Sequence, residues 1–257
     1  MRIAILGVGK MGSWLAKELS AENEVAVYDI DKGKAERVEK VQVMPSLSEL
    51  EKFKPELLIN SVTLQKTIAA FGQAAPHLPK ACVLVDVASI KEGIAEYYRK
   101  CGFRFASVHP MFGPTFADLN SLAEENAVII KESDPEFADF FRKLFSRLGV
   151  RIFDYSFKEH DEMMAYSLTT PFVTSLVFAS CLDMGVVPGS TFARHRKIAK
   201  GLLAEDDWLL CEVLFNKQSL PQLERITSRL EFLKHVIKAR DYDEAREVLE
   251  KLRKNIG

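Results

Sequence analysis

A histidine followed by two prolines and a glycine is the most chemically suggestive feature of this 257-residue sequence. His109 ends a short apolar run, residues 103–108, that is typical of a β-strand, and the chain then breaks at Pro110, Gly113 and Pro114. Histidine has an ordinary pKa of about 6.5, which makes it a ready base near neutral pH. The pattern therefore predicts a base at the end of a strand, where open sheets bind their ligands. Taken alone, residues 107–114 would fit a histidine that caps a turn better than a base.

A glycine motif near the N-terminus predicts a dinucleotide site. Gly7, Gly9 and Gly12 have G-x-G-x-x-G spacing, and they lie between an apolar run at residues 2–6 and a helical pattern. The first glycine permits a tight turn, the second lets a pyrophosphate approach the backbone, and the third lets the helix pack closely on the strand. The start of the helix then offers unpaired N–H groups to the phosphates.

The identity of the cofactor is suggested by Asp29, which ends a second apolar run at residues 24–28. An acidic residue there accepts hydrogen bonds from a ribose 2′-hydroxyl and repels a 2′-phosphate, so we expect NAD, with NADP less favoured. An ordinary turn acid before a helix is the alternative. The residues expected at the cofactor are Gly7, Gly9, Lys10, Met11, Gly12, Asp29, Val62 and Thr63.

Apolar runs and helical patterns alternate through residues 1–155. The later runs cover residues 57–59, 82–85, 103–108, 127–130 and 150–153. This alternation predicts an α/β fold with a doubly wound, Rossmann-type, largely parallel sheet. The loops after the strands of such a sheet share one edge, which would gather Gly9, Asp29, Thr63, Ser89 and His109.

Residues 156–257 lack strand patterning and predict an all-helical second domain for substrate binding and dimerisation. A long helix is expected to open at His160 and to end near Gly185; His160 stands where a helix-capping role is the default. Two last helices, near residues 220–238 and 242–254, have one apolar face each. Those faces exceed what about 100 residues bury alone, so we expect a homodimer.

A dense positive cluster, Arg194, Arg196 and Lys197, lies in the helical half; such a run is most often a solvated helix face. The whole chain has a net charge of −1, which gives no electrostatic reason to expect nucleic acid or an anionic membrane as a partner. The apolar stretch 171–188 contains polar residues and predicts a buried helix instead of a membrane span.

Four scattered cysteines without a C-x-x-C pattern predict reduced thiols in a cytoplasmic protein. No two histidines have the spacing of metal ligands, so no metal is expected. Met1 leads directly into a strand, so we also expect no signal peptide.

Taken together, these residues resemble the prephenate dehydrogenase family of tyrosine biosynthesis over nearly the whole chain. The strongest match is VHPMFGP at residues 108–114, followed by VDVASIKEG at residues 85–93 and the glycine loop. Residues 160–166 and 201–204 are similar to weaker family signatures. The resemblance implies that prephenate is oxidised with NAD or NADP and loses CO2 to give 4-hydroxyphenylpyruvate. Close relatives use arogenate and give tyrosine directly.

The resemblance also implies roles for individual residues. His109 would take the proton of the substrate's ring hydroxyl, and Ser89 would orient both groups. A cation of the helical domain would hold the ring carboxylate. Arg194 is favoured because its planar fork suits a carboxylate, Lys197 is the alternative on the same helix face, and Arg196 turns away from both.

The sequence departs from the family pattern at two positions, and two other functions remain as alternatives. Many family members have histidines where this chain has Thr169 and Phe172, so the choice between prephenate and arogenate stays open. Another small-substrate dehydrogenase or reductase of the same two-domain build, such as a pyrroline-carboxylate reductase or a hydroxyacid dehydrogenase, would have no evident use for Ser89 and His109. A non-catalytic NAD sensor would need neither a base at 109 nor cations at 194–197.

Overall fold

The computed structural model describes residues 1–113, 122–183, 185, 187–205 and 207–256. Pro114 of the VHPMFGP motif lies outside the described residues. The chain divides into two compact units, Met1–Glu162 and Met163–Gly257. The boundary expected after residue 155 lies slightly before this division after Glu162. The difference arises because the start of helix α7 packs within the first unit, where the Phe157 ring lies 6.1 Å from that of Phe105.

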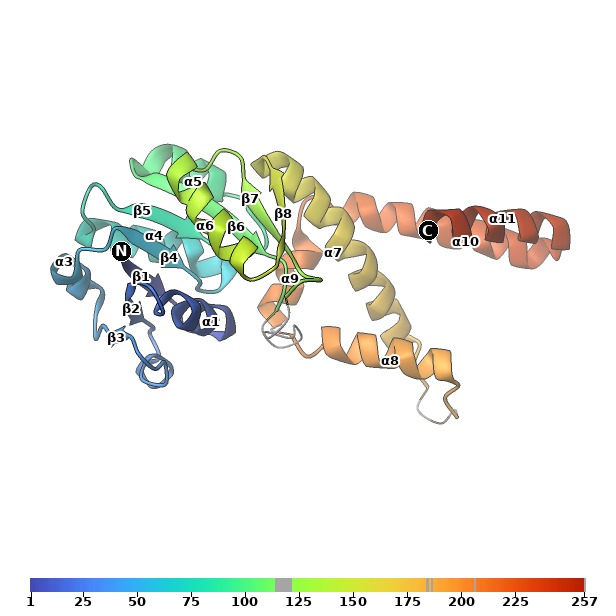
Figure 1. The fold of residues 1–257 in the computed structure, drawn as a ribbon. Helices are drawn as coiled ribbons and strands as arrows, with labels where there is room; N and C mark the ends of the chain where they lie inside the picture. The colour runs from blue at the N-terminus through green and yellow to red at the C-terminus, as the bar shows by residue number, and fades with distance from the viewer. Residues whose placement is uncertain (114–121, 184, 186, 206, 257) are drawn as a thin grey trace. The chain divides into compact units, whose positions relative to one another are not determined.

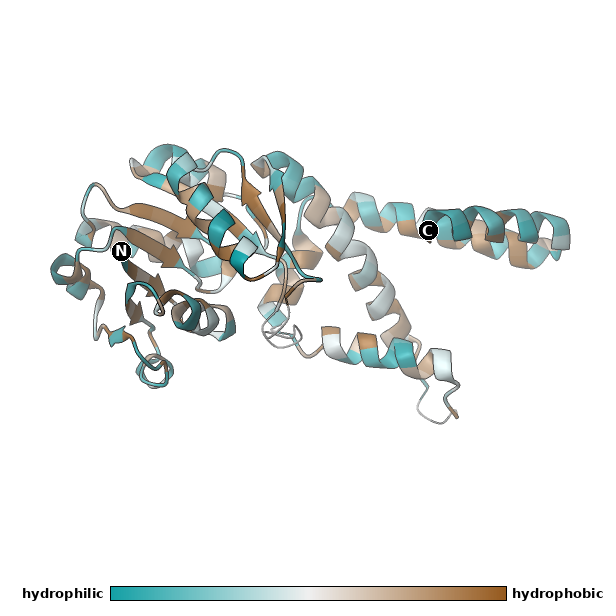
Figure 2. Cartoon of the chain, in the orientation of Figure 1, coloured by the Kyte–Doolittle hydropathy of each residue, from teal (hydrophilic) through white to brown (hydrophobic). Residues whose placement is uncertain are grey.

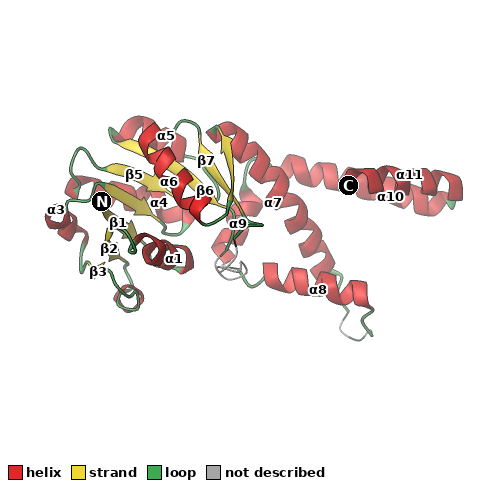
Figure 3. Ribbon diagram, viewed as in Figure 1, coloured by secondary structure: helices red, strands yellow, loops and turns green. Residues whose placement is uncertain are grey.

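Strands of the first unit form one sheet with the order β3-β2-β1-β4-β5-β6-β7-β8 (Figure 3). Their bounds are β1 Arg2–Leu6, β2 Glu24–Tyr28, β3 Gln42–Val43, β4 Leu57–Asn60, β5 Val83–Asp86, β6 Arg104–Pro110, β7 Asn126–Ile130 and β8 Arg151–Tyr155. Neighbours run parallel except β6 and β7, which are antiparallel. The predicted, largely parallel sheet is therefore confirmed, with β3 as an addition that its two residues were too short to reveal.

Helices cover both faces of this sheet (Figure 1). They are α1 Lys10–Leu19, α2 Lys32–Ala35, α3 Leu50–Phe53, α4 Thr67–Ala74, α5 Ile94–Cys101 and α6 Pro135–Arg147, with short 3-10 turns at Leu47–Glu49, Leu64–Lys66 and Ala75–His77. In β1, β4 and β5, the first and third apolar residues face one layer of helices, and the alternate residues face the other, because side chains alternate along a strand.

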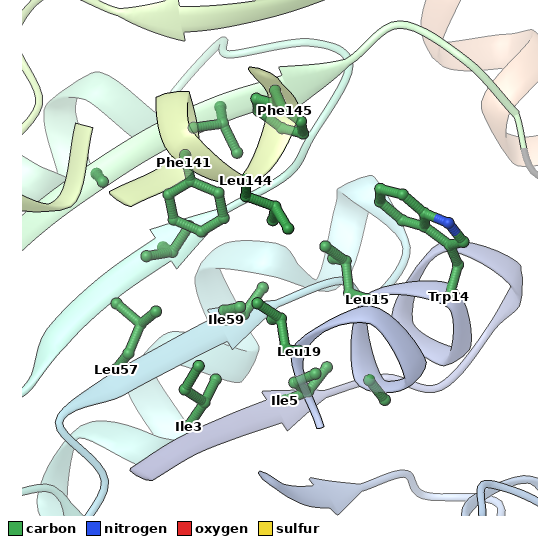
Figure 4. Packing of buried hydrophobic residues seen from close by; sticks show 14 of the residues in the cluster. Ile3, Ile5, Trp14, Leu15, Leu19, Leu57, Ile59, Phe141, Leu144 and Phe145 are labelled. Atoms are coloured by element: carbon green, nitrogen blue, oxygen red, sulfur yellow. The ribbon is translucent and has the colours of Figure 1, made fainter. Parts of the chain in front are cut away.

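Two buried clusters result from this alternation. In one, Ile3 and Ile5 of β1 pack with Trp14 of α1 and with Phe141 and Phe145 of α6 (Figure 4). The other cluster holds the alternate β1 residues together with aromatic and aliphatic side chains of α3, α4 and α5. Because the inner strands are buried on both faces, most of their residues are apolar, as the brown colour in Figure 2 shows.

The regular elements in the described part of the second unit are all helices, as predicted. Its helices are most of α7 Phe157–Ser180, then α8 Ser190–Leu202, α9 Asp207–Phe215, α10 Ser219–Ala239 and α11 Tyr242–Ile256. Helix α7 ends at Ser180, earlier than the expected end near Gly185. Inside the unit, the hydroxyls of Thr169 and Ser219 are 2.9 Å apart, and Ser219 donates to the carbonyl of Val213 at 2.6 Å, which links α7, α9 and α10.

By length and composition alone, α7 is apolar enough to cross a membrane, with a mean hydropathy of 1.2 in its most apolar window. Core helices of soluble proteins meet the same criterion. Within the single chain, 28% of that window is buried, so α7 is less buried than the helix expected for residues 171–188.

Candidate active site

The loops that follow β1, β2 and β4 are bonded to one another at one edge of the sheet. The backbone N–H of Gly7 donates to the carbonyl of Tyr28 at 2.8 Å, and that of Ser61 donates to the carbonyl of Leu6 at 2.8 Å. Gly7 has φ +80°, and a Cβ there would lie 2.8 Å from the backbone nitrogen of Val62. A side chain at residue 7 is therefore excluded by both backbone conformation and space.

Gly12 is constrained still more tightly. A Cβ at this position would lie 2.0 Å from the carbonyl oxygen of Gly7 and 2.5 Å from Oγ of Ser61. Helix α1 thus packs directly on the turn after β1, which is the close approach predicted for the last glycine of the motif.

Gly9 lies in a different environment, which fits a bound pyrophosphate. A Cβ there would meet nothing within 4 Å, and α1 begins directly after Gly9 without a side-chain cap. The exposed Lys10 is the first residue of that helix. An open backbone at an uncapped helix start presents N–H groups and a partial positive charge to an anion. Strands β2 and β4 flank β1 on opposite sides, so this loop also lies at the point where the strand order reverses.

The carboxylate of Asp29 is held against the glycine loop. Its Oδ2 accepts a hydrogen bond from the backbone of Val8 at 2.8 Å, and its Oδ1 accepts one from the backbone of Asp31 at 2.9 Å. Asp31 itself caps α2 through Gly33 at 3.0 Å. Asp29 is therefore the better placed of the two acids to meet a ribose beside the loop.

Val62 and Thr63 follow β4 beside the glycine loop. The backbone of Val62 donates to Oδ1 of Asn60 at 3.3 Å, and the carbonyl of Thr63 accepts from the Thr67 hydroxyl at 3.3 Å. These bonds fix the course of the loop. Contacts of Val62, Thr63, Lys10 and Met11 with a cofactor stay predictions.

His109 lies inside β6 and is nearly buried, with 7% of its surface exposed. It pairs with Val128 of β7, so the strand runs further than the predicted apolar run. Its Nδ1 lies 3.1 Å from Nε2 of His160, and the two rings meet edge to face. His160 in turn has its Nδ1 3.1 Å from Oδ1 of Asp161.

Burial, reinforced by the nearby His160 and Lys91, lowers the pKa of His109 well below its ordinary value. The ring is consequently neutral at pH 7, which is the form that accepts a proton. Burial also lowers the pKa of His160, against the opposing hydrogen bond to Asp161.

A buried cluster behind β5 and β6 was not foreseen from the sequence. The ammonium of Lys91 is fully buried; it forms an ion pair with Asp86 and donates to the carbonyl of Val108 at 2.8 Å. The hydroxyl of Tyr98 donates to the second oxygen of Asp86 at 3.0 Å. This cluster anchors β6 at the residue before His109. Its signal was present in VDVASIKEG, where an acid at a strand end precedes a lysine in the following loop.

Ser89 lies half-buried in the loop between β5 and Lys91. The strand that precedes it, β5, is the parallel neighbour of β6. Nδ1 of His109, however, contacts His160 and not Ser89. The orientation of His109 by Ser89 stays a prediction.

The capping role expected for His160 is wrong. Ser156 and Glu159 cap α7 reciprocally: the backbone of Glu159 donates to Oγ of Ser156 at 3.2 Å, and the backbone of Ser156 donates to Oε2 of Glu159 at 2.7 Å. A hydrogen bond from Lys131, followed by the one from Ser156, lowers the pKa of Glu159 to about 2. His160 is fully buried against His109 instead. The S-x-x-E spacing just before it would have located the cap.

Arg194, Arg196 and Lys197 all lie on α8 of the helical unit, with exposed side chains. Between them, His195 packs its ring 5.7 Å from Phe178 and keeps Nδ1 3.0 Å from the carbonyl of Thr191. The roles of the three cations stay predictions.

Known proteins identify the group to which this arrangement belongs. Residues 15–153 match the family described as prephenate dehydrogenase, nucleotide-binding domain. The chain belongs to the prephenate dehydrogenase family. This match confirms the predicted nucleotide-binding domain and the predicted resemblance to the family.

Among individual relatives, a probable arogenate/prephenate dehydrogenase from Methanocaldococcus jannaschii is 28% identical over 177 residues, which cover 64% of this chain and 38% of that protein. The chain spans only 29% to 39% of the length of the curated relatives it matches.

Solved structures of the family share the fold. Prephenate dehydrogenase from Aquifex aeolicus, in complex with hydroxyphenyl propionate and NAD+, has a TM-score of 0.85 at 19% identity and covers 99% of this chain and 96% of its own. Arogenate dehydrogenase from Synechocystis has a TM-score of 0.77 at 21% identity, with 99% and 98% covered. These likenesses extend through both units and confirm the expected order of a Rossmann-type part followed by a helical part.

Proposed function

We propose that this protein is an NAD-dependent prephenate dehydrogenase, which converts prephenate to 4-hydroxyphenylpyruvate and CO2 in tyrosine biosynthesis. The observation that carries the proposal is a buried, neutral His109 on the same sheet as a glycine loop suited to a dinucleotide. A non-catalytic NAD sensor would have no use for that base, and other dehydrogenases of this build would have no use for the VHPMFGP segment.

The residues of the chain would divide the work as follows. His109 accepts the proton of the ring hydroxyl, so that a carbonyl can develop at the carbon that loses hydride. When bound, NAD supplies the hydride acceptor. Loss of the ring carboxylate as CO2 leaves an aromatic phenol, which makes the overall step effectively irreversible. The start of α1, which has no side-chain cap, would hold the pyrophosphate, and Asp29, which is bonded to Val8, would meet the adenosine ribose.

Substrate binding is assigned to the helical unit. Arg194 is proposed to hold the ring carboxylate, with Lys197 as the alternative on the same side of α8 and Arg196 on another. Guanidinium groups bind carboxylates through two parallel hydrogen bonds, which a lysine cannot form.

Arogenate is the second candidate substrate, and one observation favours keeping it. At the two positions where many relatives have histidines, Thr169 is bonded to Ser219 and Phe172 is buried, so both serve the packing of the helical unit. The side-chain end of the substrate must then be recognised by other groups. Prephenate and arogenate differ at that end, as a keto acid and an amino acid.

The test is an assay of nicotinamide reduction with prephenate and with arogenate, each supplied with NAD and with NADP. The proposal expects the highest kcat/KM for prephenate with NAD. A preference for arogenate would replace the substrate but leave the reaction class intact, whereas no turnover of either substrate would overturn the proposal.

Assembly as a cytoplasmic homodimer through the helical unit completes the proposal. The unit exposes many large apolar side chains on α10 and α11, including Leu223, Leu230, Ile237 and Leu252. A second copy of the same surface would cover them, and closed two-fold pairs are the commonest soluble assemblies. The four cysteines are free, in keeping with a reducing compartment.

A further inference from the structure

Three side chains of the first unit form a line that ends at His109. Oδ1 of Asp161 is 3.1 Å from Nδ1 of His160, and Nε2 of His160 is 3.1 Å from Nδ1 of His109. His109 and His160 are almost fully buried, while the carboxylate of Asp161 is partly exposed. The same Oδ1 of Asp161 also accepts the backbone N–H of Lys91 at 3.1 Å, which fixes the carboxylate between α7 and the loop after β5.

The direction of each hydrogen bond in this line follows from its carboxylate end. A carboxylate only accepts, so Nδ1 of His160 must carry a proton and donate it. In a neutral ring the other nitrogen, Nε2, then has a free lone pair and accepts from Nδ1 of His109. His109 is left with its proton on Nδ1 and a free lone pair on Nε2.

We propose that His160 and Asp161 are positioning residues that hold His109 with Nδ1 protonated and Nε2 free to accept the substrate's hydroxyl proton. When Nε2 takes that proton, His109 becomes an imidazolium, whose Nδ1–H bond to His160 is strengthened and whose charge is balanced by the carboxylate of Asp161. The substrate oxygen loses the proton and His109 gains it, while the proton on His160 stays in place and Asp161 remains an unprotonated carboxylate. This inference rests on the proposed function for the identity of the reaction.

The other charged groups around His109 make Asp161 the carboxylate available for this task. Lys91, in the loop after β5, places a buried ammonium nearby, and its charge is paired with Asp86 of β5. Tyr98 of α5 stays protonated, because burial and Asp86 raise its pKa well above the ordinary value. From β7, His109 faces Val128, which carries no charge. Asp161 approaches from α7, and its charge acts on both His160 and Lys91. Among these described groups, Asp86 forms the ion pair with the Lys91 ammonium, whereas Asp161 contacts Lys91 through its backbone N–H.

Substitutions at two positions separate orientation from charge. Asp161→Asn keeps an oxygen for the N–H groups of Lys91 and His160 but removes the negative charge. His160→Gln can keep an acceptor near the position of Nε2, whereas His160→Leu removes it. His77→Gln is the matched control, because His77 forms a similar pair with Glu51, at 2.6 Å, on the surface of the same unit.

The first readout needs no substrate. Imidazole ¹⁵N shifts of the full-length protein at pH 7 should show His109 neutral with its proton on Nδ1, and His160→Leu should move a large part of the population to the other tautomer. Asp161→Asn and His77→Gln should keep the wild-type tautomer. If wild-type His109 carries its proton on Nε2, the proposal is overturned, and this result stands even where the enzyme accepts neither prephenate nor arogenate.

The second readout is kinetic. Asp161→Asn should lower kcat about 10- to 100-fold with little change in the KM for NAD, and should move the acidic limb of kcat/KM to lower pH, since the imidazolium is less stabilised. His160→Leu should lose about 100-fold or more in kcat, and His160→Gln should recover part of it. His160→Leu removes a buried polar contact, so Asp161→Asn is the decisive variant if the leucine variant does not fold. An unchanged kcat together with an unchanged pH profile in Asp161→Asn would refute the positioning role of His160 and Asp161.

Discussion

Substituting the glycines of the nucleotide loop one at a time should separate folding from cofactor binding. In Gly12→Ala, the new methyl would lie 2.0 Å from a backbone oxygen of Gly7, a contact that no side-chain rotation can relieve. In Gly9→Ala, the methyl would meet nothing within 4 Å of protein, and the backbone of Gly9 has φ −65°, which alanine adopts freely. Space for a methyl at residue 9 is space that the pyrophosphate is proposed to use.

The magnitudes follow from these contacts. Overpacking in a closely packed interior costs about 1–3 kcal/mol and more where backbone must move, so Gly12→Ala should lose at least about 3 kcal/mol of unfolding free energy. Gly9→Ala should change stability by less than about 1 kcal/mol, the usual cost of alanine at a helix N-cap. Gly72→Ala in α4 also meets nothing within 4 Å, and should be neutral or stabilising by about 0.5–1 kcal/mol.

The assay pairs urea unfolding with equilibrium NAD binding. Gly12→Ala should fail in both, Gly9→Ala should fold normally but bind NAD at least about tenfold more weakly, and Gly72→Ala should match the wild type in binding. Wild-type NAD affinity in Gly9→Ala would refute the assignment of the loop to the pyrophosphate. Wild-type stability in Gly12→Ala would mean that the close approach of α1 to the loop is wrong.

Four further outcomes are expected. Asp29→Ser should reduce the preference for NAD over NADP by about tenfold, because about 1–2 kcal/mol of repulsion is removed; equal use of both cofactors by the wild type would contradict this. Arg194→Ala should raise the KM for prephenate about 10- to 100-fold with the KM for NAD unchanged, and the same effect in Lys197→Ala alone would transfer the role. Burial lowers the pKa of both His109 and His160 in the folded chain, so the unfolded chain binds those protons first. The free energy of unfolding is therefore not reduced by these rings above about pH 7, and below about pH 6.5 it falls by up to about 1.4 kcal/mol per pH unit for each ring. In urea titrations, His160→Gln should show a smaller fall at acid pH than the wild type. The same fall in that variant would mean that the histidines do not cause it. Light scattering at micromolar concentration should give twice the chain mass of 29.0 kDa, and a single-chain mass would refute the dimer.

The parts of the fold that follow from local pattern were predictable. Strands β1, β2 and β4 are continuous apolar runs because both of their faces are buried, and their predicted bounds agree with the structure to within a residue. The two-residue β3 leaves no such pattern. The end of α7 was misplaced because the apolar composition continues past Ser180, where the helix stops.

The candidate site was predictable only where one motif carries it. The glycine loop and Asp29 form a local signature, and the structure places Asp29 against Val8 of that loop. His160 and Lys91 act through contacts with residues 51 and 17 positions away, to His109 and Val108. Sequence periodicity does not predict contacts between residues so far apart in the chain, so each residue was interpreted from its immediate neighbours. For His160, those neighbours predicted a helix cap, which is wrong.

The central claim is that His109 is the base of a prephenate dehydrogenase, and His109→Asn tests it most directly. Asparagine keeps a polar group of similar size that can still bond to His160, but it does not accept the substrate's proton. The account predicts unchanged NAD affinity, a fall of about 10²–10⁴ in kcat with prephenate, and loss of the acidic limb of kcat/KM. Near-normal turnover of prephenate by a folded His109→Asn variant would contradict it.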